Sequence, residues 1–140
     1  MKDPIWLKHA HAALTAAVDK RSDFVGIEVA RLLSDENVGS DGLILAALYW
    51  IDRMIEASPP DEVPAPAPVP DIWPADMALS QRWAVRLVAS RINNDPDTAQ
   101  ALIAEAAADF DYLSECMSML VILAGMSLGG RLAPGSRSDT

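Results

Sequence analysis

Apolar residues recur along most of this chain every three or four positions, which is the spacing of helices that bury one face. Residues 3–19 form the first such run, and Asp3 followed by Pro4 is typical of a helix start. A shorter run covers residues 22–33, and a third covers residues 41–57. No alternating strand pattern competes with these runs. The pattern therefore predicts an all-α fold.

The third run is apolar around most of its helical wheel. Its polar side chains share roughly a third of the wheel, and they are Asp41, Asp52, Arg53 and Glu56. A helix with so little polar surface needs neighbours on several sides. We therefore expect this helix at the centre of the protein.

A second set of three helices follows later in the chain. We expect these helices over residues 75–93, 95–108 and 110–128, with the last one again mostly apolar. Gly129 and Gly130 are typical of a helix C-terminus. The remaining residues to the end of the chain lack any periodic pattern, which favours a disordered tail.

A proline-rich stretch, residues 58–74, separates the two sets of helices. Proline fixes φ and lacks a backbone donor, so this stretch joins neither a helix nor a central strand. We predict a six-helix bundle of two three-helix units, residues 1–57 and 75–128, joined by this linker and followed by a tail over residues 129–140. The similar order of the halves indicates a degenerate tandem repeat, although any six-helix chain divided in the middle looks similar.

The two halves are expected to pack together as one domain. Each half is too small to bury much surface alone, and the third and sixth helices both need more cover than two neighbours provide. These two helices should therefore lie side by side. A linker of this length could also exchange the halves between two chains, so a homodimer is an alternative.

Net charge limits the classes of partner. The chain carries a net charge of −9, and an acidic surface repels phosphate backbones, which argues against nucleic acid. The charge is compatible with a basic protein partner, although it is explained as well by solubility alone, and another protein is the expected partner. No apolar stretch reaches the length of a membrane span, and Cys116, the single cysteine, cannot form an intrachain disulfide. These features predict a cytoplasmic protein without a membrane partner.

Residues that could act in catalysis or metal binding do not combine into a recognisable site. His9 and His11, two apart on a helix, point in nearly opposite directions and cannot share one metal ion. Cys116 has no base placed by the sequence to form its thiolate, so we interpret it as a buried structural residue. The acidic stripe of the third helix lacks the Glu-x-x-His partners of di-metal centres. We therefore predict no metal, no cofactor and no catalytic residues.

The segment around the linker and the fourth helix contains the candidate interface residues. Ile72 and Trp73, flanked by prolines, either pin the linker to the body or present an extended peptide to a partner. Trp83 is expected near the edge of the fourth helix's polar stripe, where a partner could contact it.

Three polar residues of the fourth helix complete this candidate interface. Gln81 interrupts an apolar stripe. It is therefore either exposed to solvent in a protruding first turn or hydrogen-bonded to a carbonyl group of the proline segment. Arg82 and Arg86 share one face, and this basic stripe either binds a carboxylate or phosphate or is simply outer surface.

These observations favour a small interaction protein, an adaptor, inhibitor or regulator of another protein, and they lean against an enzyme. One alternative is an enzyme, or a subunit that completes one, with His9, Arg82, Arg86 and the acidic stripe at its site. A further alternative is an acidic decoy of phage type that imitates nucleic acid, which requires regular rows of carboxylates. The composition, rich in Ala and Arg, is typical of a bacterial or phage protein.

Overall fold

The computed structural model describes residues 4–57 and 73–132, without the side chains of residue 40 and residues 129–132. All regular structure in these residues is helical, which confirms the predicted all-α class. The helices are α1 (Ile5–Val18), α2 (Ser22–Ser34), α3 (Gly39–Ala57), α4 (Leu79–Ile92), α5 (Pro96–Ala107) and α6 (Phe110–Leu132).

Two helix boundaries differ from the predictions. Helix α6 continues through Gly129 and Gly130, so a tail beginning at residue 129 is wrong, and residues 133–140 lie outside the described chain. Glycine ends a helix only where the backbone turns left-handed, and a helical glycine costs only about 1 kcal/mol relative to alanine. Helix α4 begins at Leu79 rather than near residue 75, because Pro74 and Met77 first form a turn closed by a 3.0 Å backbone hydrogen bond.

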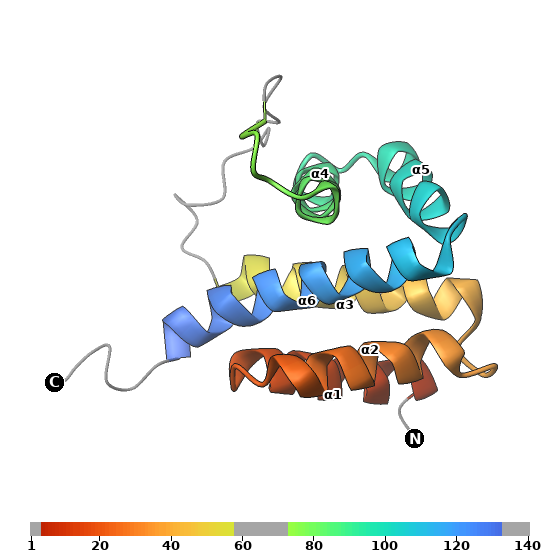
Figure 1. Ribbon diagram of the computed structural model, residues 1–140, viewed down its shortest axis with the longest axis vertical. Helices are drawn as coiled ribbons and strands as arrows, with labels where there is room; N and C mark the ends of the chain where they lie inside the picture. The colour runs from red at the N-terminus through yellow and green to blue at the C-terminus, as the bar shows by residue number, and fades with distance from the viewer. Residues whose placement is uncertain (1–3, 58–72, 133–140) are drawn as a thin grey trace, which may run out of the picture.

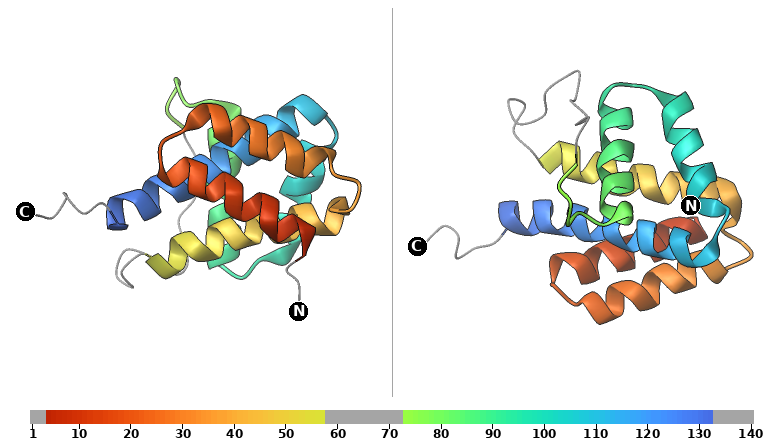
Figure 2. Two further views of the ribbon diagram at one scale, coloured as in Figure 1. Left: turned by 90° about the horizontal axis from the view of Figure 1, so that it is seen from below. Right: turned by 45° about the horizontal axis from the view of Figure 1, so that its top comes forward.

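The helices form three layers (Figure 1). Helices α1 and α2 lie on one side, α3 and α6 form the middle, and α4 and α5 lie on the other side. Helix α6 packs against each of the other five helices, and α3 packs against α6, α1 and, less extensively, α4. The prediction that the third and sixth helices lie side by side is therefore confirmed. Figure 2 shows the same arrangement from two further directions.

Helix α6 is apolar enough to raise a second interpretation. Residues Phe110–Leu128 have the length and hydropathy of a membrane span, so the prediction that no apolar stretch reaches this length is wrong, and they are the one such segment in the described chain. The central helix of a water-exposed bundle has the same composition, because it is covered by neighbours on all sides. Helix α6 packs against five helices and 39% of this segment is buried, so packing accounts for part of its apolar character.

Two fully buried tryptophans each join a pair of helices. The indole N–H of Trp50 in α3 donates to the carbonyl oxygen of Ala10 in α1 at 2.9 Å. The indole N–H of Trp83 in α4 donates to the carbonyl oxygen of Leu102 in α5 at 2.7 Å. A buried indole N–H needs an acceptor, so each bond fixes the depth at which its ring inserts.

Helices α1 and α6 approach so closely that no side chain fits at one point of contact. A Cβ atom added to Gly125 would lie 2.4 Å from the Cβ atom of Ala17 and 2.7 Å from its carbonyl carbon. Both distances are well inside van der Waals contact. The low aromatic content of the chain, 6%, agrees with a core built from small residues that allow such contacts.

Substitution of Gly125 tests this contact. Gly125→Ala should lower the free energy of unfolding by about 1–3 kcal/mol, because overpacking outweighs the gain in helix propensity. Urea denaturation measures the change. Gly26→Ala is the control, since a Cβ atom at Gly26 in α2 meets nothing within 4 Å and should stabilise the protein by up to about 1 kcal/mol. A Gly125→Ala variant at least as stable as the wild type would contradict the close contact.

Candidate functional site

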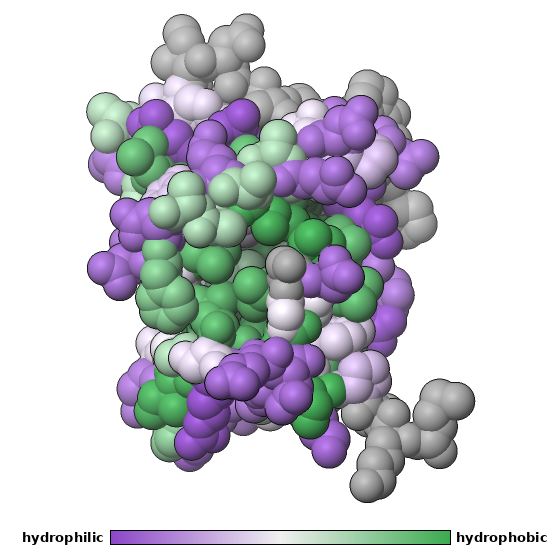
Figure 3. Space-filling model, turned by 90° about the vertical axis from the view of Figure 1, so that its right-hand side faces the viewer, coloured by the Kyte–Doolittle hydropathy of each residue, from purple (hydrophilic) through white to green (hydrophobic). Residues whose placement is uncertain are grey.

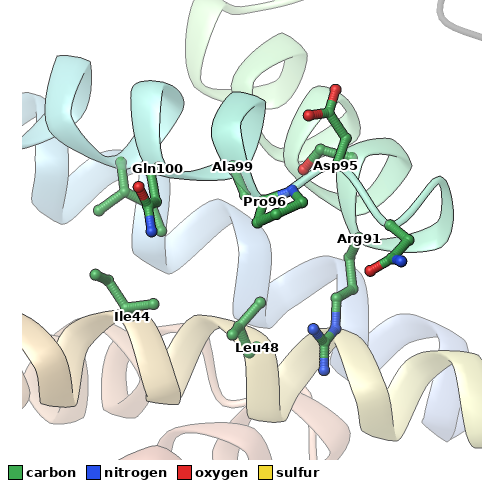
Figure 4. A pocket seen from close by; sticks show the side chains of 10 residues that line it. Ile44, Leu48, Arg91, Asp95, Pro96, Ala99 and Gln100 are labelled. Atoms are coloured by element: carbon green, nitrogen blue, oxygen red, sulfur yellow. The ribbon is translucent and has the colours of Figure 1, made fainter.

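A cavity of about 100 Å³ lies between the middle layer and the α4–α5 layer. It exists because α5 packs against α4 and α6 but makes no extensive contact with α3. Figure 4 shows side chains of α3 pointing across the gap toward those of α5. Its apolar lining consists of Ile44 and Leu48 of α3 with Pro96, Ala99 and Ile103 of α5, and we call the cavity with its whole lining the α3–α5 groove. The polar lining residues are Ser90, Arg91, Asn94, Asp95 and Gln100.

Two large apolar side chains outside the groove are also exposed. Leu45, next to Ile44 in α3, is 45% exposed, and Phe110 at the start of α6 is 57% exposed. Figure 3 looks onto the side of the molecule where α3 and α6 begin, and it shows apolar residues gathered in a hollow with polar residues around it. The prediction that α3 is covered on several sides is therefore only partly correct, because one of its faces lacks a close neighbour.

A two-bond ion pair joins α3 to α4 at the edge of the groove. Nε of Arg91 donates to Oδ1 of Asp52 and Nη2 donates to Oδ2, both at 3.0 Å. The hydrogen bonds to Asp52 raise the pKa of Arg91 above its ordinary value. Because this geometry engages both carboxylate oxygens, the charge of Arg91 is largely neutralised by its partner.

Asp95 also lies in the groove lining, but its partners differ from those of Arg91. Its carboxylate accepts hydrogen bonds from the hydroxyl of Thr98 at 2.6 Å and from the backbone N–H of Thr98 at 3.2 Å, which caps the start of α5. These two bonds lower its pKa, so Asp95 is ionised at neutral pH. Among the described side chains, no cation forms an ion pair with it.

The sequence-predicted interface residues do not form this groove. Trp83 is 1% exposed, so its predicted place at the edge of a polar stripe is wrong. The buried face of α4 also includes Ser80 and Ser90. Because both residues are polar, the hydrophobicity pattern predicts the wrong buried face for this helix. The side chain of Trp83 is therefore committed to the core of this chain.

The other candidate interface residues have more exposed positions. Oε1 of Gln81 accepts a 3.0 Å hydrogen bond from the backbone N–H of Ala78, so Gln81 closes the start of α4, a role that sequence reasoning missed. Nη2 of Arg82, rather than Gln81, contacts the carbonyl oxygen of Pro74, at 3.5 Å.

Three positions complete this set. Trp73 is half-buried and Arg86 is exposed, while Ile72 lies outside the described residues. Binding of a partner by these residues stays a prediction.

The two histidines have separate partners. Nε2 of His9 lies 3.0 Å from Oδ2 of Asp35, and Nδ1 of His11 lies 3.2 Å from the hydroxyl of Tyr49. The hydrogen bond with His9, supported by the backbone N–H of Asn37, lowers the pKa of Asp35. Within the described part of the chain, no three His, Cys, Asp or Glu side chains gather closely enough to hold a metal ion.

Cys116 is fully buried, which confirms its interpretation as a core residue. Burial raises the pKa of its thiol to about 11, and burial likewise raises the pKa of the neighbouring Tyr112 to about 12. A thiol with so high a pKa is protonated, and thus weakly nucleophilic, at neutral pH.

The raised thiol pKa predicts a loss of stability in alkali. An acid whose pKa is higher in the folded state stabilises the protein fully below its ordinary value of 9.0, and this contribution is lost as the pH rises through about 11. Between these two pH values the free energy of unfolding of the wild type should fall by roughly 1–2 kcal/mol more than that of Cys116→Ala. Urea denaturation of both proteins across this range measures the difference. Parallel pH profiles would contradict the assignment.

The Asp52–Arg91 pair is expected to contribute modestly to stability. A double-mutant cycle with Asp52→Ala and Arg91→Ala should give a coupling energy of about 0.5–1 kcal/mol, because both groups are 41% exposed. The Glu28–Arg31 pair, within one helix, is the control and should give about 0.3 kcal/mol. A coupling energy near zero for the first pair would show that the bidentate geometry does not persist in solution.

Comparison with models of known protein families, with curated proteins and with solved structures gave no match for this chain. Function must therefore be argued from its own residues.

Proposed function

We propose that this chain is a small helical interaction module that binds another protein through the α3–α5 groove, as an adaptor, inhibitor or regulator. The observation that carries this proposal is the apolar cavity of about 100 Å³ at the boundary of two helix layers. Energetically dominant contacts at protein interfaces are commonly large side chains inserted into apolar pockets. A cavity of this size accommodates one such side chain.

The wider architecture supports the same role. We propose that residues 1–57 and 75–128 are two three-helix units joined by the proline-rich segment, since α1 packs on α2 and α3, while α5 packs on α4 and α6. A groove at the boundary of two units is a common location for ligand binding. We also propose a cytoplasmic location, in keeping with a free buried thiol.

A catalytic function has one supporting observation, the contact between His9 and Asp35. An imidazole held by a carboxylate can act as a general base if a substrate binds beside it. The lining of the α3–α5 groove contains no histidine, so this pair and the groove do not combine into one site.

The acidic decoy is less well supported. Arginines pair with three of the acidic residues, in the contacts Glu28–Arg31, Asp52–Arg91 and Glu56–Arg53. A surface that imitates nucleic acid needs an uninterrupted band of negative charge. These pairs interrupt such a band on α2 and α3.

Filling the groove tests the proposed function. Ala99→Phe places a ring between α3 and α5, whereas Ala104→Phe places the same ring on the exposed face of α5. Both proteins, confirmed to be folded by circular dichroism, serve with the wild type as baits in lysate, and retained proteins are quantified by mass spectrometry. The wild type and Ala104→Phe should retain the same partner in similar amounts. Ala99→Phe should retain at least about tenfold less of it, which corresponds to a loss of ~1.4 kcal/mol in binding free energy. Equal retention by all three baits would refute a role for the groove.

A further inference from the structure

We infer that the partner segment bound in the α3–α5 groove is an amphipathic helix with basic residues on its polar face, which inserts one large apolar side chain between α3 and α5. This inference rests on the proposed function, since it names the occupant of the same groove. Shape and charge support it independently.

The shape of the groove favours a helix. Ile44 and Leu48 are four positions apart on α3, and Ala99 and Ile103 are four positions apart on α5, so two ridges with helical spacing face each other. Side chains spaced three or four apart on a third helix can interdigitate with such ridges.

Two other common modes of peptide recognition lack their structural requirement. A bound strand needs an open sheet edge, and the described chain is helical with no strand. A polyproline peptide docks on grooves lined by aromatic rings, and the lining of this groove contains no aromatic residue. A helix that lays its apolar face into an apolar groove is a mode whose requirement this lining meets.

Charge favours a basic partner. Arg91 is the only cation in the groove lining, and Asp52 neutralises it through two hydrogen bonds. Asp95 in the same lining is ionised, and the exposed Asp41 and Asp97 lie one helical turn before the lining residues Ile44 and Gln100. With a net charge of −9 the whole chain attracts cations. The same charge repels both a second copy and a phosphate backbone.

Labelled synthetic peptides test this inference. The probe is a fluorescein-labelled helical peptide of roughly 18 residues, about five turns, with leucines at helical spacing and lysines elsewhere. Matched peptides carry glutamine or glutamate in place of lysine. Fluorescence anisotropy at physiological salt measures binding to the full chain. The lysine peptide should bind at least about tenfold more tightly than the glutamine peptide, a difference of ~1.4 kcal/mol.

Variants of the protein separate the groove from general attraction. Ala99→Phe should lower the affinity for the lysine peptide at least about tenfold. Ala104→Phe should leave this affinity unchanged. Asp95→Asn keeps a residue that can cap α5 but removes the charge, so it should weaken binding roughly two- to fivefold. Asp23→Asn, in α2 on the opposite side of the molecule, is its control and should have no effect.

Each other outcome overturns the inference in a distinguishable way. Tighter binding of the glutamine or glutamate peptide, still blocked by Ala99→Phe, would refute the basic partner and leave the proposed function standing. Binding of the lysine peptide that ignores Ala99→Phe would show surface attraction alone. No binding by any peptide would refute a helical occupant. A dimer in light scattering that Ala99→Phe converts to a 15.0 kDa monomer would identify a second copy as the occupant.

Discussion

The packing of α6 against all five other helices is the constraint on which the fold depends. A single helix can serve five neighbours only if each of them comes close, and closeness requires small residues at the contacts. The contact between Gly125 and Ala17 is an example, since a Cβ atom at Gly125 would lie 2.4 Å from the Cβ atom of Ala17. The core therefore combines close backbone approach at this contact with aliphatic side chains and the two fully buried tryptophans, Trp50 and Trp83.

That same arrangement leaves the groove open. The outer layers are bound to the middle layer mainly through α6, and α3 shares only a light contact with α4. The apolar face of α3 that carries Ile44 and Leu48 is therefore left without a close neighbour. The feature that organises the core and the feature that offers a binding surface have one cause, which is an unequal division of contacts between the two central helices.

Much of the fold was predictable from local pattern, because helix periodicity and the apolar wheels of α3 and α6 are properties of short segments. The orientation of α4 was not, since Ser80 and Ser90 are polar in sequence yet buried among close-packed neighbours. The end of α6 was missed because glycine permits a helix stop without imposing one. The groove was missed because it depends on which helices fail to touch, and the only signal for it was an α3 more apolar than its expected neighbours could cover.

The bond between Asp52 and Arg91 has a mechanical meaning beyond its contribution to stability. It joins α3 to α4, two helices that make few other contacts with each other. Dissolved ions weaken attraction between half-exposed charges, whereas apolar contacts such as those around α6 are not screened. At this edge the contact between the two layers therefore depends partly on an attraction that dissolved ions weaken, whereas the packing of α4 and α5 against α6 does not.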